Sequence, residues 1–345
     1  MSTIKKIAQH AKLSIGTVDR VLHERGNVSK DAEARVLKAI EELNYKPNFF
    51  ARQLKLARTR VFGIIMPEFM QDSGYWFMPA QGIDLAKNEL EQHRIEVQYF
   101  HYDRYDEKSF VSCCERALQN QLDGYLVAPA LPDIARRFSE NLPEHIPCVY
   151  FDSSVPNSQC LCSIVQDSYT SGLLAGRLMH LLTENESSVA VIRCHEKDYH
   201  IQQRVSGFID FYAEQRLAKP QLVNRMNCDS HSDLYDFFKG FLNDKAELQG
   251  LFVTDAATYC AAKALEELKP GRKIYLIGYD LLPENIHHLK NGTIDFLISQ
   301  KSKQQGYQGL YALFRHTVLK EKVSSTIMMP IDIITRENVA YRQHD

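Results

Sequence analysis

Nine short apolar segments alternate with amphipathic stretches between residues 61 and 299, and this alternation constrains the fold more than any other feature. Each segment is four to six residues long, the length of a buried strand, and the stretches between them have the spacing of helices. The segments are VFGIIM (61–66), IEVQYF (95–100), GYLVAP (124–129), PCVYFD (147–152), SVAVIR (188–193), LVNRM (222–226), LFVT (251–254), KIYLIG (273–278) and IDFLIS (294–299). The alternation predicts parallel sheets flanked by helices, and the length of this region predicts two α/β lobes.

Residues 3–23, TIKKIAQHAKLSIGTVDRVLH, contain two short amphipathic patterns joined by a tight turn. Ser14 can cap the second helix by accepting from the free amides of its first turn. The inward-facing residues recur at helical spacing and are Ile4, Ile7, Ala8 and Ala11 in the first pattern and Val18, Val21 and Leu22 in the second. This arrangement is typical of a helix-turn-helix, although an ordinary helical hairpin would have the same spacing.

The first 60 residues are basic and periodic. They hold seven lysines and six arginines against six acidic residues, a net charge of +7, whereas the remainder carries −9. Ser29 can cap a third helix, which we expect to end before Pro47 because proline disfavours helical backbone in the residue before it. A basic head on an acidic body favours a polyanion as the partner of the head. A disordered basic arm is the alternative, against which the helical periodicity argues.

Residues 48–60, NFFARQLKLARTR, form a fourth segment that Asn48 can cap. A helix of nine or so residues is shorter than the ~12–15 that an isolated helix needs in water. Its cations Arg52, Lys55, Arg58 and Arg60 repel one another without an anion nearby. We therefore expect the segment to order only against DNA or a second copy of the chain; a plain interdomain linker is the alternative.

At this point the chain resembles the lactose-repressor (LacI/GalR) family of bacterial transcription regulators. The residues that carry the resemblance are IKKIAQHAKLSIGTVDRVLH and NVSKDAEARVLKAIEELNYKPNFFARQL, in the order found in that family. It implies that the second helix lies in the major groove, and that 48–56 forms a hinge helix in the minor groove of a dimer with Leu54 as a wedge between base pairs. Such a wedge unstacks a base step and exposes more DNA to the protein.

By this resemblance, base reading falls to Ile15, Gly16 and Arg20, and Arg20 suits the acceptors of guanine. The other residues expected to contact DNA are Thr3, Ser14, Thr17, Asn27, Ser29, Tyr45, Asn48 and Ala51. Two departures from the family leave the operator sequence open. Gly16 has no side chain to read a base, and Asp19 either accepts from cytosine or is a surface acid.

The body resembles the periplasmic sugar-binding-protein fold of the same family, through YFDSSVP (150–156), FVTDAATYCAAKAL (252–265) and LIGYD (276–280) among other stretches. The fold expected is a small all-α helix-turn-helix head plus an α/β two-lobed, periplasmic-binding-protein-like (type I) body, with crossings near 163–167, 296–300 and 327–330. The expected divisions are 1–46 for the head, 47–60 for the hinge or linker, and 61–345 for the effector domain. Within that domain we expect an N-lobe of about 61–164 and 297–327 and a C-lobe of about 165–296 and 328–345.

Polar residues at strand ends are the candidates for contacting an effector in the cleft. Carboxylates accept from the hydroxyls of a polyhydroxyl ligand and arginine donates to them, and aromatic rings can stack on the C–H face of a sugar. The candidates are Tyr75, Trp76, Phe77, Asp152, Arg204, Thr254, Asp280 and Gln300, with Asp255, His195, Tyr199 and His200 as further contributors. Core packing is the alternative for the aromatics, and a helix cap or turn is the alternative for Asp152 and Asp280.

Enzyme motifs do not emerge from the sequence. It contains no nucleotide-binding glycine motif after a strand, no Walker loop and no nucleophile elbow, and its eight cysteines lack zinc spacing. We expect no catalytic residue, metal or cofactor. No apolar run approaches the ~18 residues of a membrane span, and no secretory signal pattern begins the chain, so we expect a cytoplasmic protein without a membrane partner.

The sequence therefore predicts a homodimeric, sequence-specific regulator, acting as a repressor, that binds pseudo-palindromic operator DNA and responds to a small effector, a sugar or sugar derivative. A free-standing solute-binding protein would have no use for the helix-turn-helix. A DNA-binding architectural protein with a vestigial body is the other alternative, and a ligand-dependent shift in thermal stability would exclude it.

Overall fold

The computed structural model describes residues 4–22, 28–43, 58–184, 187–193, 195–224, 231–245 and 247–342. Contacts divide the chain into two compact units, residues 1–58 and 59–345. No helix in the described part of the chain is long and apolar enough to cross a membrane.

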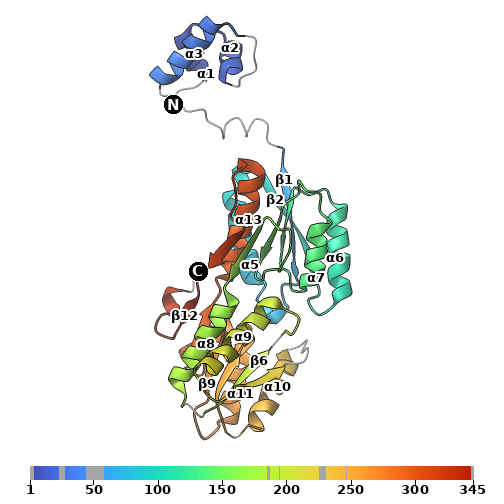
Figure 1. Cartoon of the computed structure of the whole chain (residues 1–345), viewed down its shortest axis with the longest axis vertical. Coiled ribbons are helices and arrows are strands. Elements are labelled where there is room, and N and C mark those ends of the chain that lie inside the picture. The colour runs from blue at the N-terminus through green and yellow to red at the C-terminus, as the bar shows by residue number, and fades with distance from the viewer. Residues whose placement is uncertain are drawn as a thin grey trace. The chain divides into compact units, whose positions relative to one another are not determined.

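The first unit is a bundle of three helices (Figure 1). They are α1 (Ile4–Ala11), α2 (Ile15–Leu22) and α3 (Lys30–Glu42). Each helix contributes one fully enclosed apolar side chain to the core, namely Ile7, Val18 and Val36. Between α1 and α2, Ser14 Oγ accepts a hydrogen bond from the amide of Thr17 at 3.0 Å. The two amphipathic helices and the cap predicted from residues 3–23 are confirmed.

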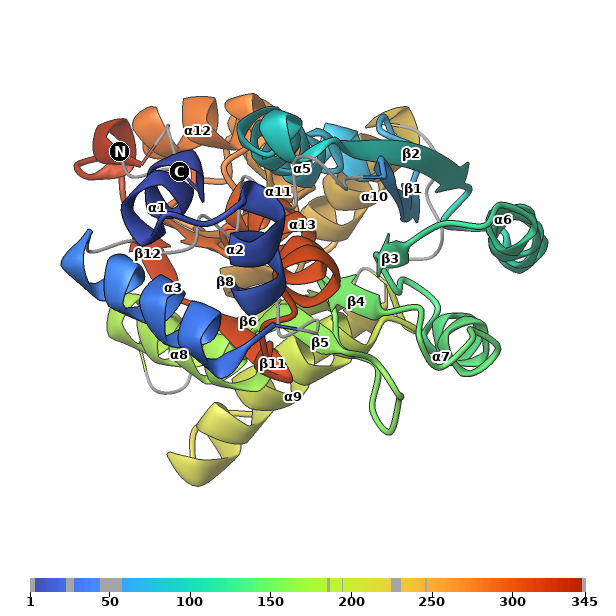
Figure 2. The same cartoon turned by 90° about the horizontal axis from the view of Figure 1, so that it is seen from above.

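The N-lobe of the second unit contains a six-stranded sheet in the order β11-β5-β4-β3-β1-β2. All neighbouring strands in it run parallel. The strands are β1 (Arg60–Pro67), β2 (Ile95–Tyr102), β3 (Gly124–Val127), β4 (Cys148–Phe151), β5 (Cys162–Gln166) and β11 (Thr326–Met329). Helices α5 (Phe77–Glu89) and α13 (Ser302–Phe314) cover one face, and α6 (Glu107–Gln119) and α7 (Pro132–Glu140) cover the other (Figure 2).

Side-chain alternation along β1 fills both halves of this core. Phe62, Ile64 and Met66 belong to the apolar cluster under α5 and α13, and Ile65 belongs to the cluster under α6 and α7. A strand buried on both faces has an almost continuous apolar sequence, which is why VFGIIM is so easily recognised.

The C-lobe repeats the layered arrangement with the sheet order β12-β10-β9-β8-β6-β7. Its strands are β6 (Ser188–Arg193), β7 (Gln221–Asn224), β8 (Leu248–Val253), β9 (Tyr275–Tyr279), β10 (Phe296–Ser299) and β12 (Asp332–Ile334). Only β12 runs antiparallel to its described neighbour. Helices α8 (Ser168–Leu182) and α9 (Tyr199–Glu214) pack on one face, and α10 (His231–Asn243), α11 (Thr258–Leu268) and α12 (Pro283–Lys290) pack on the other. The short helical turns are η1 (Asp72–Gly74), η2 (Glu91–His93), η3 (Arg315–Leu319) and η4 (Val339–Tyr341).

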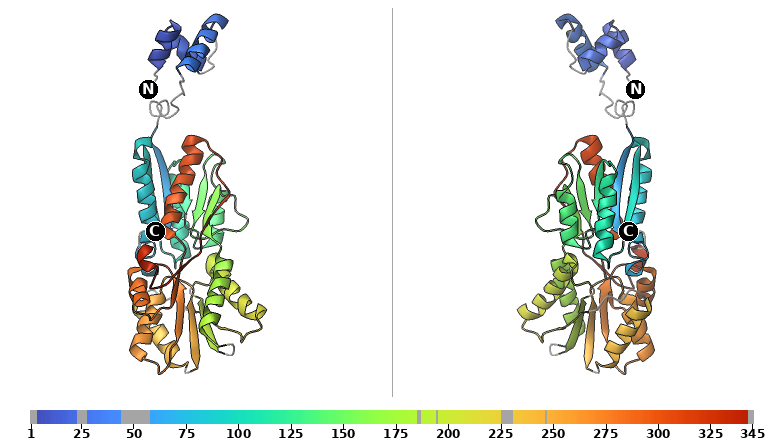
Figure 3. Two further views of the ribbon diagram at one scale, coloured as in Figure 1. Left: turned by 90° about the vertical axis from the view of Figure 1, so that its left-hand side faces the viewer. Right: turned by 90° about the vertical axis from the view of Figure 1, so that its right-hand side faces the viewer.

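The chain passes between the lobes three times, from β5 to α8, from β10 to α13 and from β11 to β12 (Figure 3). Gln166 holds the three crossings together. Its Nε2 donates to the carbonyl oxygen of Ser299 at 2.9 Å and to that of Pro330 at 2.8 Å. One side chain on the first crossing therefore contacts the other two.

Helices α8 and α9 approach each other backbone to backbone. A Cβ atom on Gly172 would lie 2.2 Å from the carbonyl oxygen of Arg204, and one on Gly207 would lie 2.0 Å from that of Tyr169. Both distances are shorter than any real contact, so glycine is required at both positions.

The nine predicted segments all contain strands, and the structure adds β5, β11 and β12. Strands β11 (TIMM) and β12 (DII) have only four and three residues, too few to show a strand period, and β5 (CSIVQ) is buried throughout but contains two polar residues.

Candidate functional site

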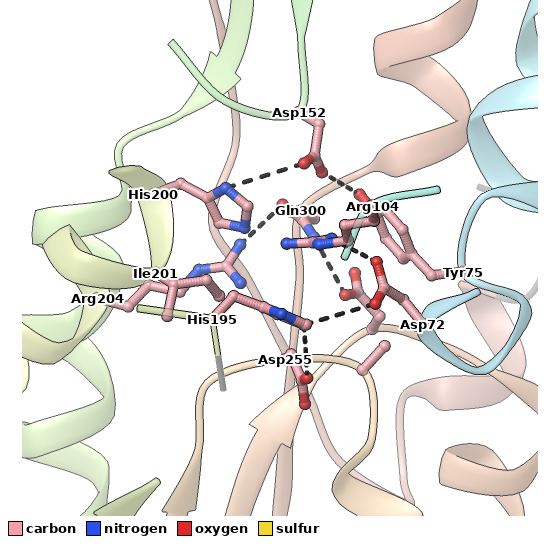
Figure 4. Close-up of a pocket in the computed structure, with 12 residues that line it drawn as sticks. Asp72, Tyr75, Arg104, Asp152, His195, His200, Ile201, Arg204, Asp255 and Gln300 are labelled. Carbon is pink, nitrogen blue, oxygen red and sulfur yellow. Dashed lines mark hydrogen bonds and ion pairs between the residues drawn. The ribbon is translucent and has the colours of Figure 1, made fainter. Parts of the chain in front are cut away.

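The carboxyl ends of strands from both lobes face one cleft. Residues following β1, β2 and β4 of the N-lobe meet residues following β6, β8 and β9 of the C-lobe. The inner cavity defined in this way is lined by Asp72, Tyr75, Arg104, Asp152, His195, His200, Ile201, Arg204, Asp255, Ala256, Asp280 and Gln300 (Figure 4). Its volume is about 20 Å³, little more than one water molecule needs. A sugar ring therefore requires the lobes to part.

Arg104 lies between carboxylates of the two lobes. Its guanidinium forms an ion pair with Asp72 of the N-lobe, and its Nη2 lies 2.5 Å from Oδ2 of Asp198 in the C-lobe. Arg104 is only 8% exposed and Asp198 only 1%. Burial by itself would raise the pKa of Asp198, but His200 and Arg104 outweigh it and lower that pKa to about 2. Both partners stay charged, and the pair joins the lobes directly.

Two histidines of the C-lobe add further contacts across the cleft. His195 Nε2 lies 3.5 Å from Asp72 Oδ1 and 3.5 Å from Asp255 Oδ2. His200 Nδ1 lies 2.6 Å from Asp198 Oδ1 and 3.9 Å from Asp152 Oδ2. Figure 4 shows the His195 ring directed toward Asp72 of the N-lobe and Asp255 of the C-lobe. The His200 ring is directed toward Asp152 of the N-lobe.

Asp152 is held on the N-lobe side by two neutral partners, a donor and an acceptor. Tyr75 donates its hydroxyl to Asp152 Oδ1 at 2.5 Å, and the amide of Asp152 donates to Gln305 Oε1 at 2.7 Å. Asp152 has a φ of 72°, a left-handed conformation that aspartate tolerates better than most residues. Burial and the neighbouring Asp152 raise the pKa of Tyr75 well above its ordinary value, so the phenol remains a donor.

Arg204 and Asp280 form the C-lobe wall. Arg204 Nη1 donates to the carbonyl oxygen of Thr254 at 2.9 Å, and Nη2 donates to Gln300 Oε1 at 2.8 Å. Its guanidinium lies 3.7 Å from the centre of the Tyr279 ring. Gln300 links Arg204 to Asp280 by hydrogen bonds, because its Nε2 donates to Asp280 Oδ2 at 3.1 Å. Burial raises the pKa of Asp280 to about 7, with Asp152 adding to the shift and Arg204 opposing it.

Eight of the predicted effector contacts therefore line the inner cavity, whereas Tyr199 does not: Tyr75, Asp152, His195, His200, Arg204, Asp255, Asp280 and Gln300. Their contact with a ligand stays a prediction.

Three other candidates, Trp76, Phe77 and Thr254, lie outside the lining of this cavity, and their contact with a ligand also stays a prediction. Trp76 is fully buried and donates its Nε1–H to Asp72 Oδ2 at 2.8 Å, so its ring is a support beneath the cavity. Phe77 is 43% exposed and stacks on Phe69 with the ring centres 5.2 Å apart. Thr254 is fully buried and donates its hydroxyl to the carbonyl oxygen of Ile192 at 2.8 Å.

The structure also adds residues that sequence reasoning missed. Asp72 and Arg104 line the cavity, and Asp198 pairs with Arg104 just behind it. The position of Arg104 in the sequence could have identified it as a cleft residue, because it closely follows the end of a strand. The predicted strand stopped at residue 100, whereas β2 continues to Tyr102.

On the helical head, the described residues predicted to contact DNA gather around the start of α2. Ile15 is 51% exposed, and Ser14, Gly16 and Arg20 are exposed as well. Ser29 Oγ accepts from the amide of Ala32 at 3.3 Å, as expected for a cap of α3. Asp19 is in α2. Thr3, Asn27, Tyr45, Asn48, Ala51 and Leu54, and the hinge helix expected at 48–56, lie outside the described residues.

Both parts of the chain match known families. The description "Bacterial regulatory proteins, lacI family" applies to residues 3–48, and "Periplasmic binding protein domain" applies to residues 62–321. A ribose operon repressor of Halalkalibacterium halodurans is 29% identical over 293 residues, covering 82% of this chain and 81% of that protein. The transcriptional repressor PurR of Histophilus somni is 26% identical over 355 residues, covering 98% and 99%.

Solved structures give the same result for the body. A protein described as a LacI transcriptional regulator from Bacteroides fragilis superposes with a TM-score of 0.75 at 29% identity, covering 82% of this chain and 99% of that one. The glucose-galactose binding protein GanP of Geobacillus stearothermophilus has a TM-score of 0.71 at 22% identity, over 82% and 99%, which shows the fold alone. A helix-turn-helix head joined to a two-lobed binding body defines a class of regulatory protein. The chain belongs to the LacI family of bacterial regulatory proteins.

Proposed function

We propose that this chain is a sequence-specific, DNA-binding repressor in the cytoplasm whose affinity for its operator is set by a carbohydrate bound between the two lobes. The observation that carries the proposal is the cleft itself. Carboxylates, an arginine and an amide from both lobes converge on one cavity, in the same chain as an exposed helix-turn-helix surface. Its relatives named above are repressors, which supports the DNA-binding part of the proposal.

The charge of the cleft favours an uncharged polyhydroxyl ligand. Four aspartates, Asp72, Asp152, Asp255 and Asp280, face two arginines in the cavity lining. Arg104 is already engaged by two carboxylates, whereas Arg204 is held by neutral acceptors and keeps its charge for a ligand oxygen. The excess of carboxylates disfavours sugar acids and phosphorylated sugars, because a buried like charge is repelled strongly. The ribose operon repressor among the relatives supports a sugar as the effector.

Lobe movement provides the link between ligand and DNA. Both lobes hold part of the ligand site, so a bound sugar changes how the lobes close. Strand β1, the first of the N-lobe, begins at Arg60, the last residue of the proposed hinge at residues 47–60. We infer that lobe closure in a dimer changes the spacing of the two hinge segments. A coupling of about 1–3 kcal/mol is typical and changes affinity about 5–150-fold.

The N-lobe offers a surface for the homodimer that this mechanism needs. Large apolar side chains are exposed in the loop before η1 and along α5 and α6, and β2 is at the edge of its sheet. These side chains are Met70, Phe77, Leu85, Val111 and Leu118. We propose that this face pairs two copies about a two-fold axis, which places two heads on a pseudo-palindromic operator.

Two experiments on the full chain test the proposal. Selection from random double-stranded DNA should enrich a palindromic sequence, and a thermal-shift screen should identify sugars that stabilise the protein. Uncharged mono- and disaccharides are expected to raise the melting temperature, and sugar acids and sugar phosphates are not. A stabilising sugar should then change operator affinity at least fivefold in a gel-shift titration. Selection that enriches no DNA sequence would overturn the regulator, and stabilisation by sugar phosphates alone would overturn the ligand class.

A further inference from the structure

The cleft has a second, larger chamber beside the inner cavity. This outer chamber has a volume of about 190 Å³, against about 20 Å³ for the inner cavity. Asp152 and His200 line both, so the two spaces share a wall. Side chains from the loop after β4, the end of β5 and the first turns of α8 and α9 surround the outer chamber, among them Ser153, Ser154, Gln166, Tyr169, Tyr199 and Gln203.

The outer chamber contains a buried hydrogen-bond acceptor with no partner among the described residues. Gln166 is 4% exposed, and its Oε1 accepts no hydrogen bond. The orientation of its amide is fixed, because Nε2 donates to the carbonyl oxygens of Ser299 and Pro330 and the oxygen could not replace it there. A buried acceptor left unsatisfied costs free energy, so a ligand hydroxyl that donates to Gln166 Oε1 gains a favourable partner.

The rest of the lining suits a sugar ring without charge. Serine hydroxyls and glutamine amides both donate and accept, which is what a ring with several hydroxyls requires. Tyr169 and Tyr199, on separate helices, add aromatic surface for the C–H face of a ring. Tyr169 is held in place because its hydroxyl donates to Asp210 Oδ2 at 3.1 Å. The carboxylate of Asp167 is engaged in capping α8, where it accepts from the amide of Thr170 at 2.9 Å.

We propose that the outer chamber is a second sugar subsite and that the effector is a disaccharide or a longer glycoside. This inference rests on the proposed function, which places a carbohydrate in the cleft. The first unit occupies the opened inner cavity, and the second lies beyond Asp152 and His200 against Gln166. Because Gln166 contacts all three crossings, recognition of the second unit reaches the segments about which the lobes move.

Paired probes on the full-length protein test the second subsite. The dissociation constants of glucose and galactose are measured by calorimetry beside those of maltose, cellobiose, lactose and melibiose, which contain the same rings. A disaccharide that fills both subsites is expected to bind at least tenfold more tightly than its component monosaccharide. Ser154→Phe, which fills the outer chamber from a half-buried loop position, should abolish this gain and change monosaccharide binding less than twofold. Ser154→Ala is the matched control and should keep the gain.

The outcomes separate the subsite from the function on which it rests. If a monosaccharide binds, changes operator affinity and is not surpassed by any disaccharide, the second subsite is wrong and the proposed function stands. If Ser154→Phe weakens both classes of sugar equally while its circular dichroism and melting temperature match those of Ser154→Ala, the subsite is again wrong. If no sugar of either length binds, both the subsite and the carbohydrate effector fall, whereas operator selection still tests the DNA-binding function.

Discussion

Arg104 of the N-lobe and Asp198 of the C-lobe form a buried ion pair, with Nη2 and Oδ2 2.5 Å apart. Because Arg104 also pairs with Asp72, its guanidinium bridges one carboxylate from each lobe. Removal of one member of such a group is costly, since the remaining buried charges lose their partner. The lobes are thus held together by charge before any ligand arrives.

Arg104→Met should lower the free energy of unfolding by about 3–5 kcal/mol, the usual cost of breaking a buried ion pair. Arg136→Met is the matched control. Arg136 pairs with Asp133 at 2.7 Å, but its side chain is 38% exposed and that of Asp133 is 80% exposed. Such surface pairs contribute about 0–1 kcal/mol. Chemical denaturation of both variants measures the difference, and equal losses would show that Arg104 does not hold the lobes together.

Asp280→Asn should change how stability depends on pH. The pKa of Asp280 is raised to about 7 in the folded protein, so the folded state binds a proton more tightly than the unfolded state does. The stability that this group contributes is present below pH 4 and is lost as the pH rises through about 7. At pH 8 the variant should therefore be more stable than the natural protein, by about 1.4 kcal/mol for each unit of pKa difference.

Melting temperatures between pH 4 and pH 8 measure this effect in the unliganded protein. Asp133→Asn, at an exposed position, should follow the natural protein across the range. If Asp280→Asn also follows it, the carboxyl is not raised in the folded state.

Arg204→Lys should weaken binding of the stabilising sugar about 10–100-fold. Lysine lacks the planar fork with which Arg204 donates to Thr254 and Gln300 and lies over Tyr279, so the donor to the ligand loses its position. Operator affinity without sugar should stay within twofold. Arg177→Lys, on the exposed side of α8, serves as the control for both assays. Equal effects of the two substitutions on sugar binding would exclude Arg204 from the ligand site.

Arg20→Ala should cost about 1–3 kcal/mol on the selected operator and relax the preference for guanine at one position in each half-site. Arg20 is exposed in the last turn of α2, four residues after Gly16, so the two residues lie on the same face of the helix. Lys38→Ala, on the exposed face of α3, should weaken binding to all sequences alike or not at all. Repeated selection with each variant distinguishes the two patterns. An unchanged preference in Arg20→Ala would show that α2 does not read that base.

Leu54→Ala should weaken operator binding at least tenfold while sugar binding is unchanged, because alanine is too small to unstack a base step. Leu54 lies outside the described residues, so this prediction depends on the sequence and on its resemblance to the family. Gel-shift titration and calorimetry on the same preparation provide the two readouts. Unchanged operator affinity would remove the wedge from the mechanism.

Sequence predicted most of the fold because the buried strands are apolar on both faces. VFGIIM and LFVT carry that signal, whereas CSIVQ of β5 is buried throughout but interrupted by Ser163 and Gln166, and TIMM of β11 is only four residues long. Strand ends also located Asp152, Asp280 and Gln300 at the cleft, since parallel strands bring their carboxyl ends to one edge.

The other features of the site could not be predicted from the sequence, because they depend on how distant segments pack together in the folded protein. Three consecutive aromatics at residues 75–77 do not show which ring faces the cavity, and the structure selects Tyr75 while burying Trp76 beneath it. Arg104 and Asp198 are far apart in the chain and meet only because the lobes close on each other. A contact between lobes follows from their relative placement, which the sequence of either lobe alone does not specify.

The backbone contact between α8 and α9 makes these two helices a rigid unit within the C-lobe. The backbone of Gly172 packs directly against the carbonyl oxygen of Arg204, so Arg204, which we propose faces the ligand, rests on the neighbouring helix. Helix α8 starts at Ser168, two residues after Gln166 on the first crossing between the lobes. Because no side chain separates the two backbones at Gly172 and Gly207, a displacement of α9 there would move α8 with it, and α8 leads directly to the first crossing.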